Sequence, residues 1–549
     1  MRENRSSYIS SEVLKMGKKD DIDVLSLLKR YEYWVAQGKI QFLQNDPEQQ
    51  TEVLSVLATL IGDFEKAKKE AESTCGEISE NLDWNKTHER GRDLWHKLAS
   101  SALNDIDDKS KGKSALFDFL DAATKFEDIL YGLEPYYRDH TLHSLWVYFL
   151  GEHILRDHVP QIHKNLVWYL FNDIEDEKRD YEYGKHLVGE ARKRETTIKK
   201  DINKHRDAVW CIIALCHDLG YSLSKLNELN NRVKEVIEFF DIPDLRRVGY
   251  SLDIEHQYLV SQFLEIMAMD VRIVPSENYR DKNVRLNEKV LIKSYRDDPI
   301  YWELCRALEK KQHGILSAFL LYKVLSMFGD AWVREPGEIW GLSEEEVKEN
   351  IIYGNILYSI AQHTFEFTYL KRVGSLAEIL VLADELEEFS RYGRQLQSRK
   401  YHDTMAFSSI EFIRPGRKKD VDIKIKYIVT KHRSLGDFFV RKAERLCRIY
   451  SLEEKKEKEK GWRIKSIEIT TQKDGKNTWF YLDADPKKCK GFLPETCIDK
   501  QTYPEKKYDL FCQDDQLYVK IGKGITLREW FKNLKSAEWQ DEGFFESIY

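Results

Sequence analysis

Long apolar runs are missing from this chain of 549 residues. No stretch approaches the roughly 20 consecutive apolar residues that cross a bilayer, so we expect no membrane-spanning segment. No apolar signal core follows the first residues, 1–7, which predicts a cytoplasmic protein.

Paired cysteines and a strong net charge are missing as well. The eight cysteines are scattered along the chain, without the close spacing of zinc ribbons or disulfide frameworks, and are expected to be reduced thiols. The net charge of -7 gives no overall attraction for nucleic acid. Small phosphate-bearing ligands are therefore favoured over duplexes.

What the sequence does contain predicts a mainly α protein of about two to three domains. Hydrophobic residues make up 42% of the chain, which is enough for a large core. The apolar period is close to 3.6 residues as far as about residue 400. We predict a helical extension at 1–130, a helical metal-binding segment at 131–395 and a smaller α+β module at 396–549.

In the C-terminal module the apolar period changes to 2, as at 421–427 and 463–469, which indicates strands. Residues 473–476 have the composition of a hairpin turn, and 434–450 have the pattern of an amphipathic helix. The predicted order of a strand, a helix and then further strands is compatible with a small regulatory ligand-binding module and equally with a structural one. No phosphate loop is present in it.

The strongest chemical signal is the apolar helical stretch at 210–215, which leads directly into His217 and Asp218. Two metal-ligand side chains are thus expected where a buried helix ends. Burying an imidazole and a carboxylate is costly unless they are hydrogen-bonded or coordinate a cation, so we predict a metal site. The chain's other pair, His402-Asp403, lies in a polar stretch typical of an exposed turn.

Further ligand-type residues occur on two other predicted helices. Asp139 suits a helix start, and His140 and His143 then share one face of that helix. Asp384 interrupts the apolar stripe of a later helical segment at 376–386. Each of these helices is expected to direct a polar side chain inward.

The order His143, then His217 and Asp218, then Asp384 resembles the HD-domain metal-dependent phosphohydrolases, over about residues 131–395. The resemblance implies an all-helical core in which these four residues bind a divalent cation. Nitrogen and oxygen ligands suit Mn, Fe, Co, Ni, Mg or Zn without distinguishing them. It also implies a nucleotide substrate, foremost a deoxynucleoside triphosphate cleaved to nucleoside and triphosphate. In bacteria, such nucleotide depletion would suit antiviral defence.

Two assignments of the remaining histidines stay open. In HD enzymes with two metals, His313 and His363 would complete a second site bridged by Asp218, which suits a cyclic-nucleotide or oligonucleotide phosphodiesterase. In the deoxynucleotide triphosphohydrolases one metal is enough, and His256 would be the general acid or base near the scissile phosphate, with Asp218 as the other catalytic residue. The sequence departs from that subfamily, because it lacks a Gly-His-Pro-Phe stretch after the His-Asp pair. A non-catalytic nucleotide sensor is a third interpretation.

Three residues near these motifs are candidate ligands for substrate phosphate, namely Arg138, His140 and Lys225. The alternatives are a surface salt bridge for Arg138 and a solvated side chain for Lys225. The other partners that we consider are a nucleotide allosteric effector and a second copy of the chain, contacted through the N-terminal helices.

Overall fold

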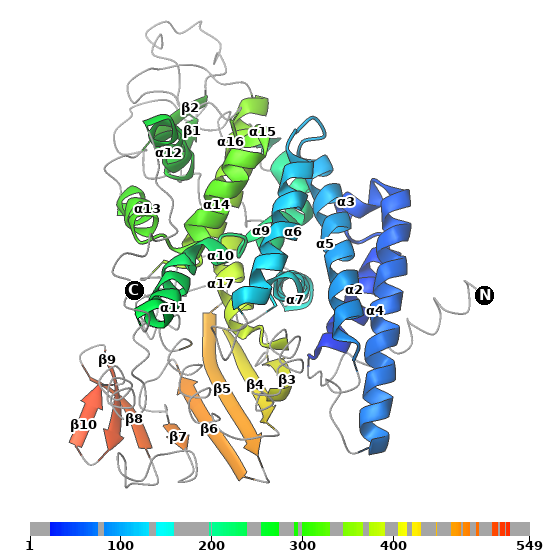
Figure 1. The fold of residues 1–549 in the computed structure, drawn as a ribbon, viewed down its shortest axis with the longest axis vertical. Coiled ribbons are helices and arrows are strands. Elements are labelled where there is room, and N and C mark those ends of the chain that lie inside the picture. The colour runs from blue at the N-terminus through cyan, green and yellow to red at the C-terminus, as the bar shows by residue number, and fades with distance from the viewer. Residues whose placement is uncertain are drawn as a thin grey trace, which may run out of the picture.

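A computed structural model of the chain shows a mainly helical protein, as predicted, with a β-sheet below the helices in the view of Figure 1. The structure describes residues 22–74, 82–130, 139–158, 197–198, 200–238, 254–273, 290–294, 299–329, 344–365, 373–389, 405–413, 420–429, 446, 463–473, 476–483, 490–492, 508–513, 516–521 and 523–526. Among the helices so described, none is long and apolar enough to span a bilayer.

The N-terminal segment is helical, as its periodicity predicts. Its helices are α2 (Val24–Ala36), α3 (Gln41–Gln44), α4 (Pro47–Thr74), α5 (Trp84–Ile106) and α6 (Lys113–Leu130). Asp23 is the N-cap of α2: its side chain accepts a hydrogen bond from the Ser26 amide, while the Ser26 hydroxyl accepts one from the Asp23 amide. Helices α2 and α5 both contact α7 (His140–His153), so this segment packs directly on the candidate site helices.

The central helices surround α9 (Arg206–Cys216), every residue of which is buried. A helix that is apolar on all sides is expected to lie inside a protein. The other elements of this segment are η3 (Ile154–His158), η7 (Asn203–His205), α10 (Tyr221–Ser224), α11 (Leu226–Glu238), α12 (Ile254–Met267), α13 (Pro299–Glu309), α14 (His313–Val324), α15 (Ser326–Gly329), α16 (Glu344–Gln362), α17 (Leu376–Leu386) and the antiparallel strands β1 (Met269–Ile273) and β2 (Val290–Ser294).

Two buried tryptophans hold α9 between its neighbours. The indole of Trp95 on α5 donates a hydrogen bond to the Leu215 carbonyl at 3.0 Å. The indole of Trp210 on α9 donates to the Tyr148 carbonyl on α7 at 3.2 Å. Because a buried indole N–H needs an acceptor, these bonds specify how the three helices pack.

A buried ion network joins the end of α7 to the start of α9. Arg156 donates to Glu152 at 2.5 Å and to Asp207 at 2.7 Å. Burial raises the pKa of Glu152, and Arg156 opposes that shift. At 1.5 Å per residue, Glu152 lies roughly 13 Å along α7 from His143. The network thus sets the alignment of the two helices at the end remote from the candidate ligands.

The C-terminal module contains a sheet, and the two predicted strands are confirmed as parts of β4 and β5. The strand order is β10-β9-β8-β7-β6-β5-β4-β3, antiparallel throughout except for the parallel pair β4 and β5. The strands are β3 (Met405–Ile413), β4 (Asp420–Val429), β5 (Arg463–Lys473), β6 (Lys476–Asp483), β7 (Lys490–Phe492), β8 (Tyr508–Gln513), β9 (Gln516–Ile521) and β10 (Lys523–Thr526).

The predicted hairpin at 473–476 is confirmed, because β5 and β6 pair antiparallel with Lys473 opposite Lys476. Parallel pairing of β4 with β5 requires a crossover connection. The helix predicted at 434–450 belongs to that connection and lies outside the described residues apart from Leu446.

One apolar core includes residues from all three predicted segments, such as Leu28, Trp210 and Ile423. The backbone of Ile22, just before α2, exchanges two hydrogen bonds with Ile410 on β3. The division into three domains at 1–130, 131–395 and 396–549 stays a prediction.

Candidate metal centre

The start of α7 positions the first histidines. Asp139 is the N-cap, and its buried side chain accepts a hydrogen bond from the Leu142 amide at 3.1 Å. The His143 amide bonds to the Asp139 carbonyl at 2.7 Å, which closes the first turn. This cap places His140 and His143 one turn apart, as their spacing predicts.

His217 and Asp218 lie in the turn that follows α9. The Tyr221 amide bonds to the Asp218 carbonyl at 3.0 Å, and the Gly220 amide donates to the Ser317 hydroxyl on α14 at 2.7 Å. A β-carbon on Gly220 would lie 2.6 Å from the His313 carbonyl oxygen. The turn can approach α14 this closely because residue 220 has no side chain.

Replacing Gly220 by Ala is expected to lower the free energy of unfolding by about 1–3 kcal/mol, because backbone atoms of α14 must move to admit the new methyl group. Urea denaturation would measure the change. The matched control is Gly62→Ala on α4, where a β-carbon meets nothing within 4 Å and helix propensity favours Ala. Equal stability of the two variants would contradict the packing argument.

Helix α17 supplies the last of the four predicted ligands. Its start is a capping box in which Ser375 accepts from the Glu378 amide and Glu378 accepts from the Ser375 amide. The helix is buried over almost its whole length, and Asp384 lies in its last turn. Helix α17 contacts both α7 and α9.

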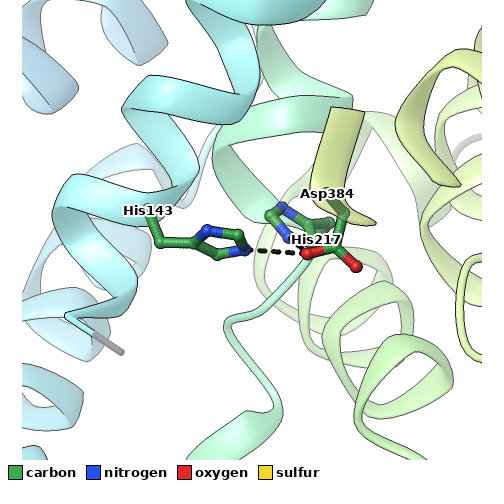
Figure 2. Close-up of side chains that lie close together, drawn as sticks. All are labelled: His143, His217 and Asp384. Atoms are coloured by element: carbon green, nitrogen blue, oxygen red, sulfur yellow. Dashed lines mark hydrogen bonds and ion pairs between the residues drawn. The ribbon is translucent and has the colours of Figure 1, made fainter. Parts of the chain in front are cut away.

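The structure brings His143, His217, Asp218 and Asp384 together. His143 Nε2 lies 2.9 Å from Asp384 Oδ1, and His217 Nε2 lies 3.9 Å from the same oxygen (Figure 2). Asp218 Oδ2 is 3.4 Å from Nε2 of both histidines. Both imidazoles are fully buried. Four ligand-type side chains, from the two helices α7 and α17 and from the turn after α9, thus converge on one point.

His313 and His363 approach the opposite oxygen of Asp218. Their Nε2 atoms lie 3.3 Å and 3.5 Å from Asp218 Oδ1, and 3.2 Å from each other. Helices α14 and α16 pack closely here, since a β-carbon on Gly314 would lie 2.7 Å from the Ile360 carbonyl oxygen. Asp218 therefore has one carboxylate oxygen directed at each pair of imidazoles.

The outer nitrogens of two imidazoles are occupied by backbone carbonyls. His217 Nδ1 donates to the Ala214 carbonyl at 2.8 Å, and His363 Nδ1 donates to the Ile360 carbonyl at 2.6 Å. A proton on Nδ1 leaves the lone pair on Nε2, which is the form that binds a metal. The buried His217 Nε2 has no hydrogen-bond partner within the ranges that the structure describes. A buried nitrogen lone pair of this kind is a suitable ligand for a divalent cation.

The charges in the cluster suit a cation site. Burial opposes ionisation of Asp218, yet the neighbouring imidazoles of His217, His313 and His363 hold its pKa well below the usual value. Burial lowers the pKa of His313 to about 4. For His363 burial acts in the same direction, but Asp218 outweighs it and raises the pKa. Near neutral pH the site thus offers an ionised carboxylate beside a neutral imidazole.

Two overlapping groups of side chains could hold a metal ion, His143 with His217 and Asp384, and His217 with Asp218 and His363. In each group the ligand atoms lie within 4.8 Å of one another. No family model, no curated protein and no solved structure matches this chain. The donor set of imidazole nitrogens and carboxylate oxygens is typical of sites for divalent transition metals.

The predicted phosphate-binding residues differ in where the structure places them. His140 lies beside the cluster, with Nε2 3.9 Å from Asp218 Oδ2. Lys225 is buried, so the alternative of a solvated lysine is wrong, and its Nζ lies 5.2 Å from the ring centroid of Tyr221. Arg138 lies outside the described residues. His256 belongs to the first turn of α12, and its side chain is likewise outside them.

Tyr221 is a site residue that the sequence reasoning missed. Its ring centroid lies 4.1 Å from that of His140 and 5.4 Å from that of His313. It lines a small hollow together with His140, Asp218, Ser144 and Thr124. Its position three residues after Asp218, at the start of the helix that follows the turn with the His-Asp pair, was the available signal.

Glu387 is a second residue that sequence reasoning missed. Its fully buried carboxylate accepts a hydrogen bond from His143 Nδ1, the nitrogen that faces away from the cluster. Glu387 follows Asp384 by three residues, which is the spacing that keeps two side chains on one side of a helix end. An acidic residue directly after a buried apolar helix was the available signal.

Proposed function

We propose that the chain is a metal-dependent phosphohydrolase acting on nucleotides. The observation that carries the proposal is the two-sided environment of Asp218. One carboxylate oxygen faces His143 and His217, and the other faces His313 and His363. Together with Asp384, this donor set supports the resemblance to HD-domain phosphohydrolases, which was based on motif order alone.

His143, His217, Asp218 and Asp384 would hold a first divalent cation, and His313 and His363 would complete a second site across Asp218. Bound cations of this kind make a coordinated water acidic and neutralise phosphate oxygens. The nucleotide substrate, foremost a deoxynucleoside triphosphate, is proposed from the family resemblance.

The chain's own side chains would then bind and orient the phosphate. His140 is placed for this role, because its ring packs against that of Tyr221 in a tilted arrangement and its Nε2 lies 3.9 Å from Asp218 Oδ2. An imidazole in this position can donate a hydrogen bond to a phosphate oxygen or hold a proton near neutral pH. The side chains of His143 and His217 are fully buried, whereas Asp218 and His140 line the small hollow. Water would therefore reach the cluster from the hollow.

A phosphodiesterase acting on a cyclic nucleotide or an oligonucleotide is the second candidate. It is favoured by His313 and His363, whose Nε2 atoms both approach Asp218 Oδ1. Two cations bridged by a carboxylate clamp the attacking and leaving oxygens of a diester. A site for one cation does not need these two imidazoles.

Incubation of the purified protein with Mn²⁺ or Mg²⁺ and a pooled panel of nucleotides and cyclic dinucleotides would test the proposal, with every product identified by mass spectrometry. We expect a deoxynucleoside triphosphate to disappear as nucleoside and triphosphate form. Linear products from a cyclic substrate would support the diesterase instead. Absence of turnover with every substrate and either metal would contradict the enzymatic proposal and favour a nucleotide sensor.

A further inference from the structure

The end of α17 contacts both ring nitrogens of His143. Asp384 lies 2.9 Å from Nε2, on the side of the cluster, and Glu387 accepts a hydrogen bond from Nδ1 on the other side. The Glu387 amide bonds to the Ala383 carbonyl at 2.9 Å, which anchors residue 387 to the last turn of the helix. Orientation of the His143 ring is therefore set by one short segment.

The hydrogen-bond partner of His143 Nδ1 differs in kind from the partners of His217 Nδ1 and His363 Nδ1. His217 and His363 donate their Nδ1 protons to neutral backbone carbonyls. His143 donates to a carboxylate that has no exposed surface. A charged acceptor makes a stronger hydrogen bond than a neutral one, and it increases the electron density at the opposite nitrogen.

We propose that Glu387 is a positioning residue for the metal centre, which keeps His143 Nε2 directed at the cluster and increases its strength as a ligand. The inference rests on the proposed metal site and adds a residue to it. A buried carboxylate is costly unless it has a charged or strongly donating partner, and the His143 imidazole is such a partner for Glu387.

Glu387→Gln tests the inference, because it keeps the shape of the side chain and removes the charge. We expect its Kd for Mn²⁺, measured by titration calorimetry on metal-stripped protein, to rise about 10- to 100-fold. The melting temperature of the metal-free variant should stay near that of the wild type. Glu387→Ala, which also removes the acceptor, should weaken Mn²⁺ binding further.

Glu388→Gln is the matched control, since Glu388 is the next residue and is equally buried. Its Kd for Mn²⁺ should be unchanged. Equal Mn²⁺ affinity of the wild type and Glu387→Gln would overturn the inference, as would equal weakening by both Gln variants. A wild-type protein that binds no Mn²⁺ would instead contradict the proposed metal site, so the two failures are distinguishable.

Discussion

Replacing His217 and Asp218 together by Ala is expected to remove the bound metal and to lower turnover by at least about a thousand-fold, since a catalytic cation supplies several kcal/mol of charge stabilisation. The change removes His217 Nε2, a buried imidazole nitrogen without a hydrogen-bond partner in the described structure. It also removes the carboxylate whose two oxygens face the two pairs of imidazoles.

The helical fold should survive this double substitution. The turn that carries the pair is held by backbone bonds, from the Tyr221 amide to the carbonyl of residue 218 and from the Gly220 amide to Ser317. Neither bond needs the deleted side chains. Circular dichroism should therefore match the wild type.

Turnover of the double variant would be compared with that of His402→Ala/Asp403→Ala, in which the chain's other His-Asp pair is removed. This control should keep wild-type activity, because its pair belongs to a stretch that the sequence predicts to be an exposed turn. Wild-type turnover after loss of His217 and Asp218 would show that the active site lies elsewhere.

His313→Ala and His363→Ala are each expected to reduce the metal content from two ions per chain towards one. These imidazoles approach the Oδ1 oxygen of Asp218, whereas His143 lies on the Oδ2 side and remains in place. Elemental analysis after equilibrium dialysis against Mn²⁺ would give the stoichiometry.

His205→Ala is a suitable control for the stoichiometry, because His205 also pairs with an aspartate, Asp105 at 2.9 Å, away from the cluster. Its metal content should equal that of the wild type. Unchanged occupancy in both the His313 and the His363 variants would reject a second site and leave the assignment with a single cation.

Local sequence signals predicted the helices that carry the candidate ligands. Asp139 marked the start of α7, the apolar stretch before His217 marked α9, and the position of Asp384 in an apolar stripe marked α17. Each signal arises within one or two helical turns, which is why it can be read without the fold. The meeting of these side chains was expected from the family resemblance.

The contacts of Glu387 and Tyr221 could not be predicted from such local signals. The contact between Glu387 and His143 joins residues 244 positions apart. The ring contact of Tyr221 with His140 joins residues 81 positions apart, on two different helices. The arrangement of the sheet is likewise not contained in local signals, because an apolar period of 2 predicts a strand but not the strand with which it pairs. The parallel pairing of β4 and β5 was therefore not predicted.

Anomalous diffraction at the manganese edge, from crystals grown with Mn²⁺, tests the central claim most directly. The predicted result is an anomalous peak bounded by His143, His217, Asp218 and Asp384, with a second peak on the side of His313 and His363. Ordered side chains at saturating Mn²⁺ without a peak among the first four residues would contradict the account.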